Sequence, residues 1–171
     1  MRHRTLLAAV IVTLGIGTAA LVHAGQTTSK HAADPATGHV MVTPADLKWG
    51  PVPPVFPAGA QLAVLDGDPS KPGYFSIRLK MPDGYKVAPH WHPTDENIVV
   101  VQGVFKVGGG DTYSDSATHE LAAGSFTKMP KRMHHFAAAK GETIVHIYGP
   151  GPFAMTYVNP ADDPSKKSGT K

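Results

Sequence analysis

Two histidines and a glutamate in the middle of the chain have the residue types and spacing of a metal site. His90 and His92 are separated by one residue, so on a β-strand their side chains project from the same face. Residues 93–95 read Pro-Thr-Asp and predict a turn, after which Glu96 begins a new strand-like run. Two neutral imidazoles and a carboxylate suit a divalent ion such as iron, manganese, zinc, nickel or copper. The segment therefore predicts a metal site shared by two consecutive strands.

A histidine pair further along the chain offers one more imidazole for the same ion. His134 and His135 are adjacent, and the alternation of a strand lets only one of them face inward. Other groups that could transfer protons are few. His134, His146 and Tyr148 are the catalytic candidates, although a histidine such as His146 is more often a core residue that makes a structural hydrogen bond.

Short alternating runs separated by turn residues predict an all-β domain. Residues 74–80 alternate most clearly, with Phe75, Ile77 and Leu79 on one face. No stretch has the long 3.6-residue period of an amphipathic helix. The predicted strands are 61–65, 74–80, 86–92, 97–102, 104–107, 125–129, 133–138, 143–148 and 153–158, with a loop at 108–116. The candidates for an apolar lining of the site are Val101, Phe126, Val145 and Ile147.

The first 24 residues have the pattern of a signal peptide. Arg2 and Arg4 form a basic start, residues 5–22 are uncharged, and Val22-His23-Ala24 presents small residues where a signal peptidase cleaves. An uncleaved membrane anchor is the alternative, and the small residues favour cleavage. We therefore expect an exported protein, periplasmic or secreted, without stable membrane association after cleavage.

The regions flanking the predicted strands are polar or rich in proline. Residues 25–58 predict a flexible leader followed by an extended, proline-rich segment, residues 59–159 the folded domain, and residues 160–171 a polar tail. Arg2 and Arg4 are the only Lys, Arg, Asp or Glu residues in 1–24, so cleavage lowers the formal charge from +3 to +1. This balance argues against a nucleic-acid partner. The absence of cysteine excludes disulfides and thiolate ligands.

These residues resemble the two sequence signatures of the cupin superfamily. The first signature is Gly, five residues, His, one residue, His, three or four residues, Glu, six residues, Gly. Its fixed positions are filled here by Gly84, His90, His92, Glu96 and Gly103. The second signature is matched by Gly124, Pro130 and His135, while Arg132 and Ala139 stand where Gly and Asn are usual. The spacing from Pro130 favours His135 over His134 as the ligand.

The resemblance to small single-domain bacterial cupins implies a jelly-roll barrel, also called a double-stranded β-helix, over residues 59–159. It implies one divalent metal ion held by His90, His92, Glu96 and His135, a small-molecule ligand or substrate, and pairing into a homodimer. Our leading interpretation of function is a metal-dependent enzyme acting on a small organic molecule, with dioxygenase-like oxidoreductase chemistry. The alternative is a non-catalytic cupin that binds a metal or a small ligand for sensing or storage.

Overall fold

A computed structural model describes residues 38–167 of the chain. The predicted signal peptide, the first part of the leader and the last four residues of the tail lie outside these residues. Within them, nine strands form one antiparallel sheet. No helix in this part of the chain is long and apolar enough to cross a membrane.

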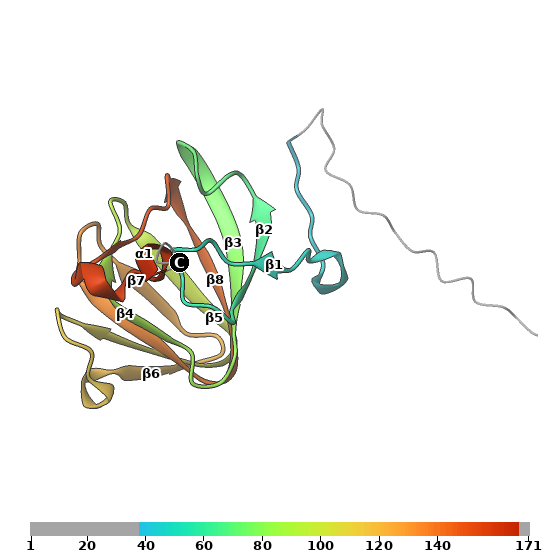
Figure 1. Cartoon of the computed structure of the whole chain (residues 1–171). Coiled ribbons are helices and arrows are strands. Elements are labelled where there is room, and N and C mark those ends of the chain that lie inside the picture. The colour runs from blue at the N-terminus through green and yellow to red at the C-terminus, as the bar shows by residue number, and fades with distance from the viewer. Residues whose placement is uncertain (1–37, 168–171) are drawn as a thin grey trace, which may run out of the picture. The chain divides into compact units, whose positions relative to one another are not determined.

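The described elements are strands, with short helices near both ends and in one loop (Figure 1). The strands are β1 Gly50–Pro51, β2 Gln61–Asp66, β3 Gly73–Met81, β4 Lys86–Trp91, β5 Glu96–Gly109, β6 His119–Ala122, β7 Phe126–Met129, β8 His135–Gly151 and β9 Thr156–Tyr157. The helices are the 3-10 turns η1 Pro44–Asp46, η2 Asp115–Ala117 and η3 Pro160–Asp162, and the single α-helical turn α1 Pro164–Lys167.

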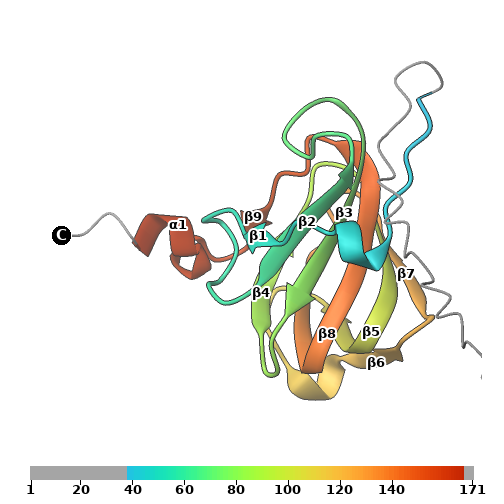
Figure 2. The same ribbon diagram turned by 90° about the vertical axis from the view of Figure 1, so that its right-hand side faces the viewer.

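The two long strands β5 and β8 organise the sheet. β8 pairs with β3, β4 and β5, and β5 also pairs with β6 and β7. Figure 2 shows β2, β3, β8 and β5 side by side. The sheet curls because β8 pairs with β4 near its start and with β3 over its second half. A sheet of this curvature encloses an apolar interior between its own strands.

Bulges let β5 bend without ending. The sequence predicts two strands here, 97–102 and 104–107, but the structure has one strand whose pairing with β8 shifts at Gln102. Gly103 lies in the shift with a φ of 75°, a conformation that glycine adopts without strain. The predicted strands 133–138 and 143–148 likewise merge into β8.

The core lies on the concave face and follows the predicted alternation. Phe75, Ile77 and Leu79 of β3 are all buried, as are Val145 and Ile147 of β8. Apolar surface removed from water contributes roughly 25 cal/mol per Å², so this face supplies most of the stabilisation of the sheet.

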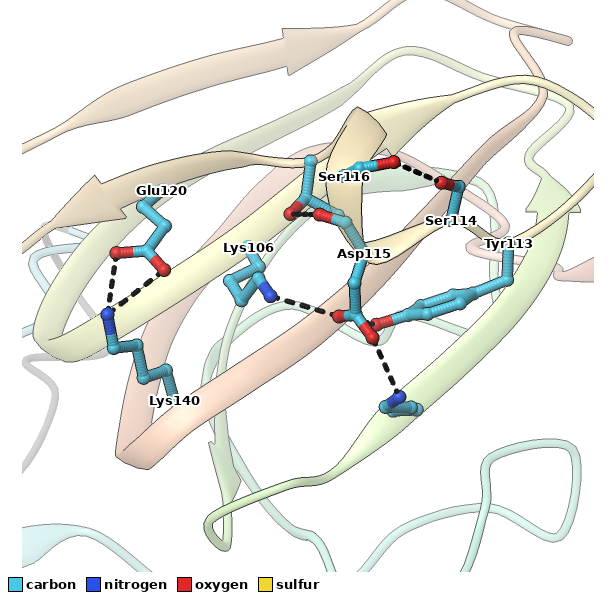
Figure 3. Close-up of polar contacts among 9 residues, drawn as sticks. Lys106, Tyr113, Ser114, Asp115, Ser116, Glu120 and Lys140 are labelled. Atoms are coloured by element: carbon cyan, nitrogen blue, oxygen red, sulfur yellow. Dashed lines mark hydrogen bonds and ion pairs between the residues drawn. The ribbon is translucent and has the colours of Figure 1, made fainter.

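The loop that follows β5 packs against the outer face of β8 and is held by a carboxylate (Figure 3). Asp115 accepts hydrogen bonds from Lys106 Nζ at 2.9 Å and from the Tyr113 hydroxyl at 2.8 Å. The Tyr113 ring in turn contacts Phe136, whose side chain is fully buried. Phe136 directly follows His135, so the loop packs against the strand that carries this histidine.

Candidate metal centre

The ends of three strands bring the predicted ligands into the interior. His90 lies in β4 directly opposite His135, the first residue of β8. His92 follows β4 by one residue, and Glu96 is the first residue of β5. The side chains of all four are buried, with residue exposures of 2–5%.

The three imidazoles converge on one point. One ring nitrogen from each of His90, His92 and His135 lies within 4.8 Å of the other two. Their ring centroids are 4.2–5.4 Å apart. Three imidazole nitrogens at these separations could hold a metal ion.

Backbone carbonyls fix which ring nitrogen of each histidine faces that point. Nδ1 of His90 lies 2.8 Å from the Ala88 oxygen, Nδ1 of His92 lies 2.8 Å from the Ala154 oxygen, and Nδ1 of His135 lies 3.0 Å from the Met133 oxygen. A carbonyl oxygen only accepts, so each Nδ1 carries the proton and donates it. In the neutral ring, Nε2 then presents a lone pair to the interior, which is how metal-ligating histidines are commonly oriented.

Glu96 lies beside two of the imidazoles. Its Oε2 is 3.2 Å from His135 Nε2 and 3.5 Å from His92 Nε2. The set of mutual distances below 4.8 Å contains the three histidines and not this carboxylate. The structure thus gathers three of the four predicted ligands closely and places the fourth against His92 and His135.

The pKa directions keep His90 and His92 neutral and the Glu96 carboxylate ionised. Burial, helped by the other two histidines, lowers the pKa of His90 to about 3. Burial lowers the pKa of His92 by more than Glu96 raises it. Burial raises the pKa of Glu96, but the neighbouring imidazoles, chiefly those of His92 and His135, together lower it by more than burial raises it. The pKa of Glu96 therefore falls below its usual value.

This arrangement leaves acceptors facing one another. His92 Nε2 and Glu96 Oε2 are buried and make no hydrogen bond within the described residues. Unpaired buried polar atoms are rare in folded proteins, and two adjacent acceptors repel unless a positive charge lies between them. A bound cation would satisfy both atoms, so the residues present fit a metal ion.

The centre opens onto a small apolar cavity of about 30 Å³. That volume has room for about two water molecules. Besides the four predicted ligands, the residues between 38 and 167 that line it are all apolar. These are Phe56, Leu79, Met81, Val87, Ile98, Phe105, Ala137, Val145, Ile147 and Phe153.

The three catalytic candidates lie outside this cavity. His134 Nδ1 pairs with Asp111 Oδ1 at 2.6 Å, and its side chain is 40% exposed. His146 and Tyr148 lie on the face of β8 opposite Val145 and Ile147, because successive strand residues alternate. His146 Nε2 is 2.7 Å from the Ser76 hydroxyl, which matches the structural hydrogen bond expected for this histidine.

The prediction of an apolar lining is wrong for two of its four residues. Val101 and Phe126 are 38% and 56% exposed, whereas Val145 and Ile147 line the cavity. Alternation from the buried Glu96 turns Ile98 and Val100 inward and Val101 outward. Phe126 pairs with Val99, which shares the outward face of β5.

Sequence reasoning missed two aromatic residues of the cavity wall. Phe153 stacks on the His92 ring, with centroids 4.4 Å apart and planes 12° apart. Phe56 reaches the cavity from the segment between β1 and β2. Both lie in stretches rich in proline, where no periodicity indicates which side chain turns inward.

Comparison with known proteins identifies the family. The sequence profile described as the ChrR cupin-like domain matches residues 37–154. The match covers more than half of the chain, so the protein belongs to the ChrR cupin-like family. This confirms the predicted cupin resemblance and the all-β, jelly-roll fold. No curated protein gave a significant match.

Solved structures share the fold at low sequence identity. The polyketide cyclase RemF from Streptomyces resistomycificus has a TM-score of 0.59 at 18% identity, covering 76% of this chain and 92% of that chain. A candidate acetylacetone dioxygenase from Methylibium petroleiphilum PM1 has a TM-score of 0.57 at 20% identity, covering 74% of this chain and 85% of that one. An RmlC-like cupin from Shewanella frigidimarina NCIMB 400 has a TM-score of 0.50 at 16% identity, covering 64% and 89%.

Proposed function

We propose that this protein is an exported, metal-dependent cupin enzyme that acts on a small organic molecule, with dioxygenase-like chemistry as the leading assignment. The observation that carries the proposal is the position of Nδ1 in the three buried histidines, each 2.8–3.0 Å from a backbone carbonyl oxygen. Each Nδ1 donates to a backbone carbonyl, so each Nε2 lone pair is free for a metal.

The ligand set favours one divalent ion from the series iron, manganese, zinc, nickel and copper. His90, His92 and His135 would hold it, with Glu96 supplying a carboxylate oxygen beside two of them. When bound, such an ion supplies a Lewis acid, and any of these metals except zinc also supplies redox chemistry.

The residues around the centre would orient a substrate and exclude water. Phe153 fixes the plane of the His92 ring by stacking on it, while Leu79, Ile98 and Val145 present only hydrocarbon to the cavity. A dry site strengthens electrostatic interactions with any group that enters it. Two relatives with this fold are named as a polyketide cyclase and a candidate acetylacetone dioxygenase, which supports oxygen-containing organic molecules as the substrate class.

A non-catalytic metal or ligand binder is the second candidate function. The observation that favours it is the composition of the cavity, where the described residues supply no acid or base beyond the four predicted ligands. An enzyme of this design would therefore rely on the ion itself and on its ligands for proton transfer.

Oxygen uptake by the iron-loaded protein separates the two functions. We expect uptake with at least one member of a panel of catechols, flavonols and diketones, and its loss in His92→Ala. A matched control, His146→Ala, changes a histidine outside the cavity and should retain uptake. Metal binding without uptake across the panel would favour the non-catalytic function.

Export is part of the proposal and has its own test. It rests on the basic start, uncharged stretch and small residues of 1–24. Cell fractionation and N-terminal sequencing should find a periplasmic or secreted protein that begins at Gly25. An uncleaved chain in the cytoplasm would contradict it.

A further inference from the structure

A second hollow lies outside the metal cavity, beside the segment that joins β1 to β2. It has a volume of about 330 Å³, within the range typical of small-molecule sites. None of its lining residues in the described part of the chain is charged. The lining consists of Pro51, Val52, Pro53, Pro54, Phe56 and Pro164, with two alanines and a glycine. Figures 1 and 2 show this segment beside α1, which contributes Pro164.

Two buried tyrosines hold the segment against the barrel. The Tyr85 hydroxyl donates to the Pro57 carbonyl oxygen at 2.6 Å, and the Tyr157 hydroxyl donates to the Val55 carbonyl oxygen at 2.9 Å. Burial raises the pKa of both hydroxyls, that of Tyr157 to about 12, so both remain donors at neutral pH. The two bonds bracket Phe56 and fix the backbone on either side of it.

Among residues 38–167, Phe56 is the one that lines both hollows. The inner cavity, with room for about two waters, is too small for an organic molecule unless a wall residue moves. Since the backbone around Phe56 is fixed, rotation of its side chain is the smallest movement that joins the two spaces.

We propose that the second hollow, termed the outer groove, binds an uncharged, mainly apolar organic molecule. In this proposal Phe56 is the gate between the outer groove and the metal cavity. The inference rests on the proposed function, because it assigns the route and the class of that function's substrate. The chemistry of the lining selects the class: prolines, Val52 and Phe56 offer apolar contacts and no counter-charge, so an ionised ligand would lose hydration without compensation.

Amide NMR of the purified protein tests the groove with two probes of similar size, benzyl alcohol and benzoate. Benzyl alcohol should shift the amides of Val52, Ala58 and Ala60, which line the groove alone. Benzoate should bind about tenfold more weakly or worse. Equal affinity of the two probes, or no shift at these amides, would overturn the assignment of the groove.

A variant pair tests the gate. In Phe56→Ala, the shifts caused by benzyl alcohol should extend to Ile98 and Val145, which line only the inner cavity. Phe126→Ala removes an exposed phenyl ring that lines neither space and should keep the wild-type pattern. If Ile98 and Val145 stay unshifted in a folded Phe56→Ala protein, Phe56 is not the gate.

Metal analysis of the same samples separates this inference from the proposed function. Bound metal with no probe response in the groove overturns the inference alone. A probe response in a protein that takes up no metal overturns the proposed function and leaves the groove as a binding site.

Discussion

Arg132 donates its backbone N–H to the carbonyl oxygen of His92 at 2.8 Å, and it does so with a φ of 63°. This is the position where the second cupin signature has glycine. The left-handed backbone explains that preference, since side chains rarely adopt it. Arg132 occupies it while its guanidinium lies 5.8 Å from the Trp91 ring centroid, a contact that offsets part of the strain.

The effect of a substitution at Arg132 on the free energy of unfolding should therefore depend on how well the new residue fits a left-handed backbone. We expect Arg132→Gly to change the free energy of unfolding by less than about 1 kcal/mol, because relief of strain offsets the lost ring contact. Arg132→Val should cost about 2 kcal/mol, because a β-branched residue fits this conformation poorly. Urea denaturation measures both. Equal effects of the two substitutions would rule out a conformational cause.

Gly84 and Gly103, the two glycines of the first cupin signature, should differ in their tolerance of a methyl group. A Cβ at Gly103 would overlap the Glu142 carbonyl oxygen and lie 2.7 Å from the Thr143 hydroxyl, whereas one at Gly84 would meet nothing within 4 Å. Both have positive φ. We expect Gly103→Ala to cost about 3 kcal/mol and Gly84→Ala about 1 kcal/mol in unfolding free energy. A smaller loss at Gly103 than at Gly84 would contradict the close approach of β5 and β8.

Glu96→Gln should have opposite effects on the metal-free and metal-bound protein. The amide can donate a hydrogen bond to a facing imidazole nitrogen, which removes the unpaired acceptors. Without metal, the variant should be more stable than wild type by about 1–3 kcal/mol. Its metal affinity should fall about tenfold or more. Denaturation of the chelator-treated proteins and competition titration of the metal measure the two effects. A less stable metal-free variant would argue against repulsion between Glu96 and His92.

Acid should destabilise the metal-free protein at pH values well above those at which carboxylates ordinarily titrate. The pKa of His90 is about 3 in the fold, against 6.5 as the ordinary value. Between these values the unfolded chain binds more protons than the folded chain, so stability is lost as pH falls below about 6.5. His90 alone contributes a slope of about 1.4 kcal/mol per pH unit in that window.

Urea denaturation from pH 7 to pH 5 checks this slope. His90→Gln should flatten it, while His119→Gln, at an exposed histidine of β6, should leave it unchanged. An unaltered slope in His90→Gln would show that other groups cause the acid sensitivity.

Local patterns predicted the alternating runs and the shared face of His90 and His92, whereas His135 was predicted from the resemblance to the second cupin signature. Alternation placed Phe75, Ile77 and Leu79 in the core, and the spacing of His90 and His92 put both on one face. What local patterns could not supply was the relation between distant segments. The bulge at Gly103 joins two predicted strands into one, and only a register anchored at Glu96 turns Val101 outward.

The position of Phe56 likewise depends on residues that are distant in the sequence. Its place in the cavity wall depends on hydroxyl groups 29 and 101 positions further along the chain, on Tyr85 and Tyr157. Nothing in the spacing of residues 50–58 predicts those two hydrogen bonds, and the prolines there only predict an extended backbone.

Elemental analysis of three purified proteins tests the central claim most directly. Wild type should carry about one divalent metal ion per chain. His135→Ala, which removes one of the three converging imidazoles, should carry none, whereas His134→Ala, which removes the neighbouring ring paired with Asp111, should keep it. Retention of the metal by His135→Ala, or its absence from wild type reconstituted with each candidate ion, would contradict the account.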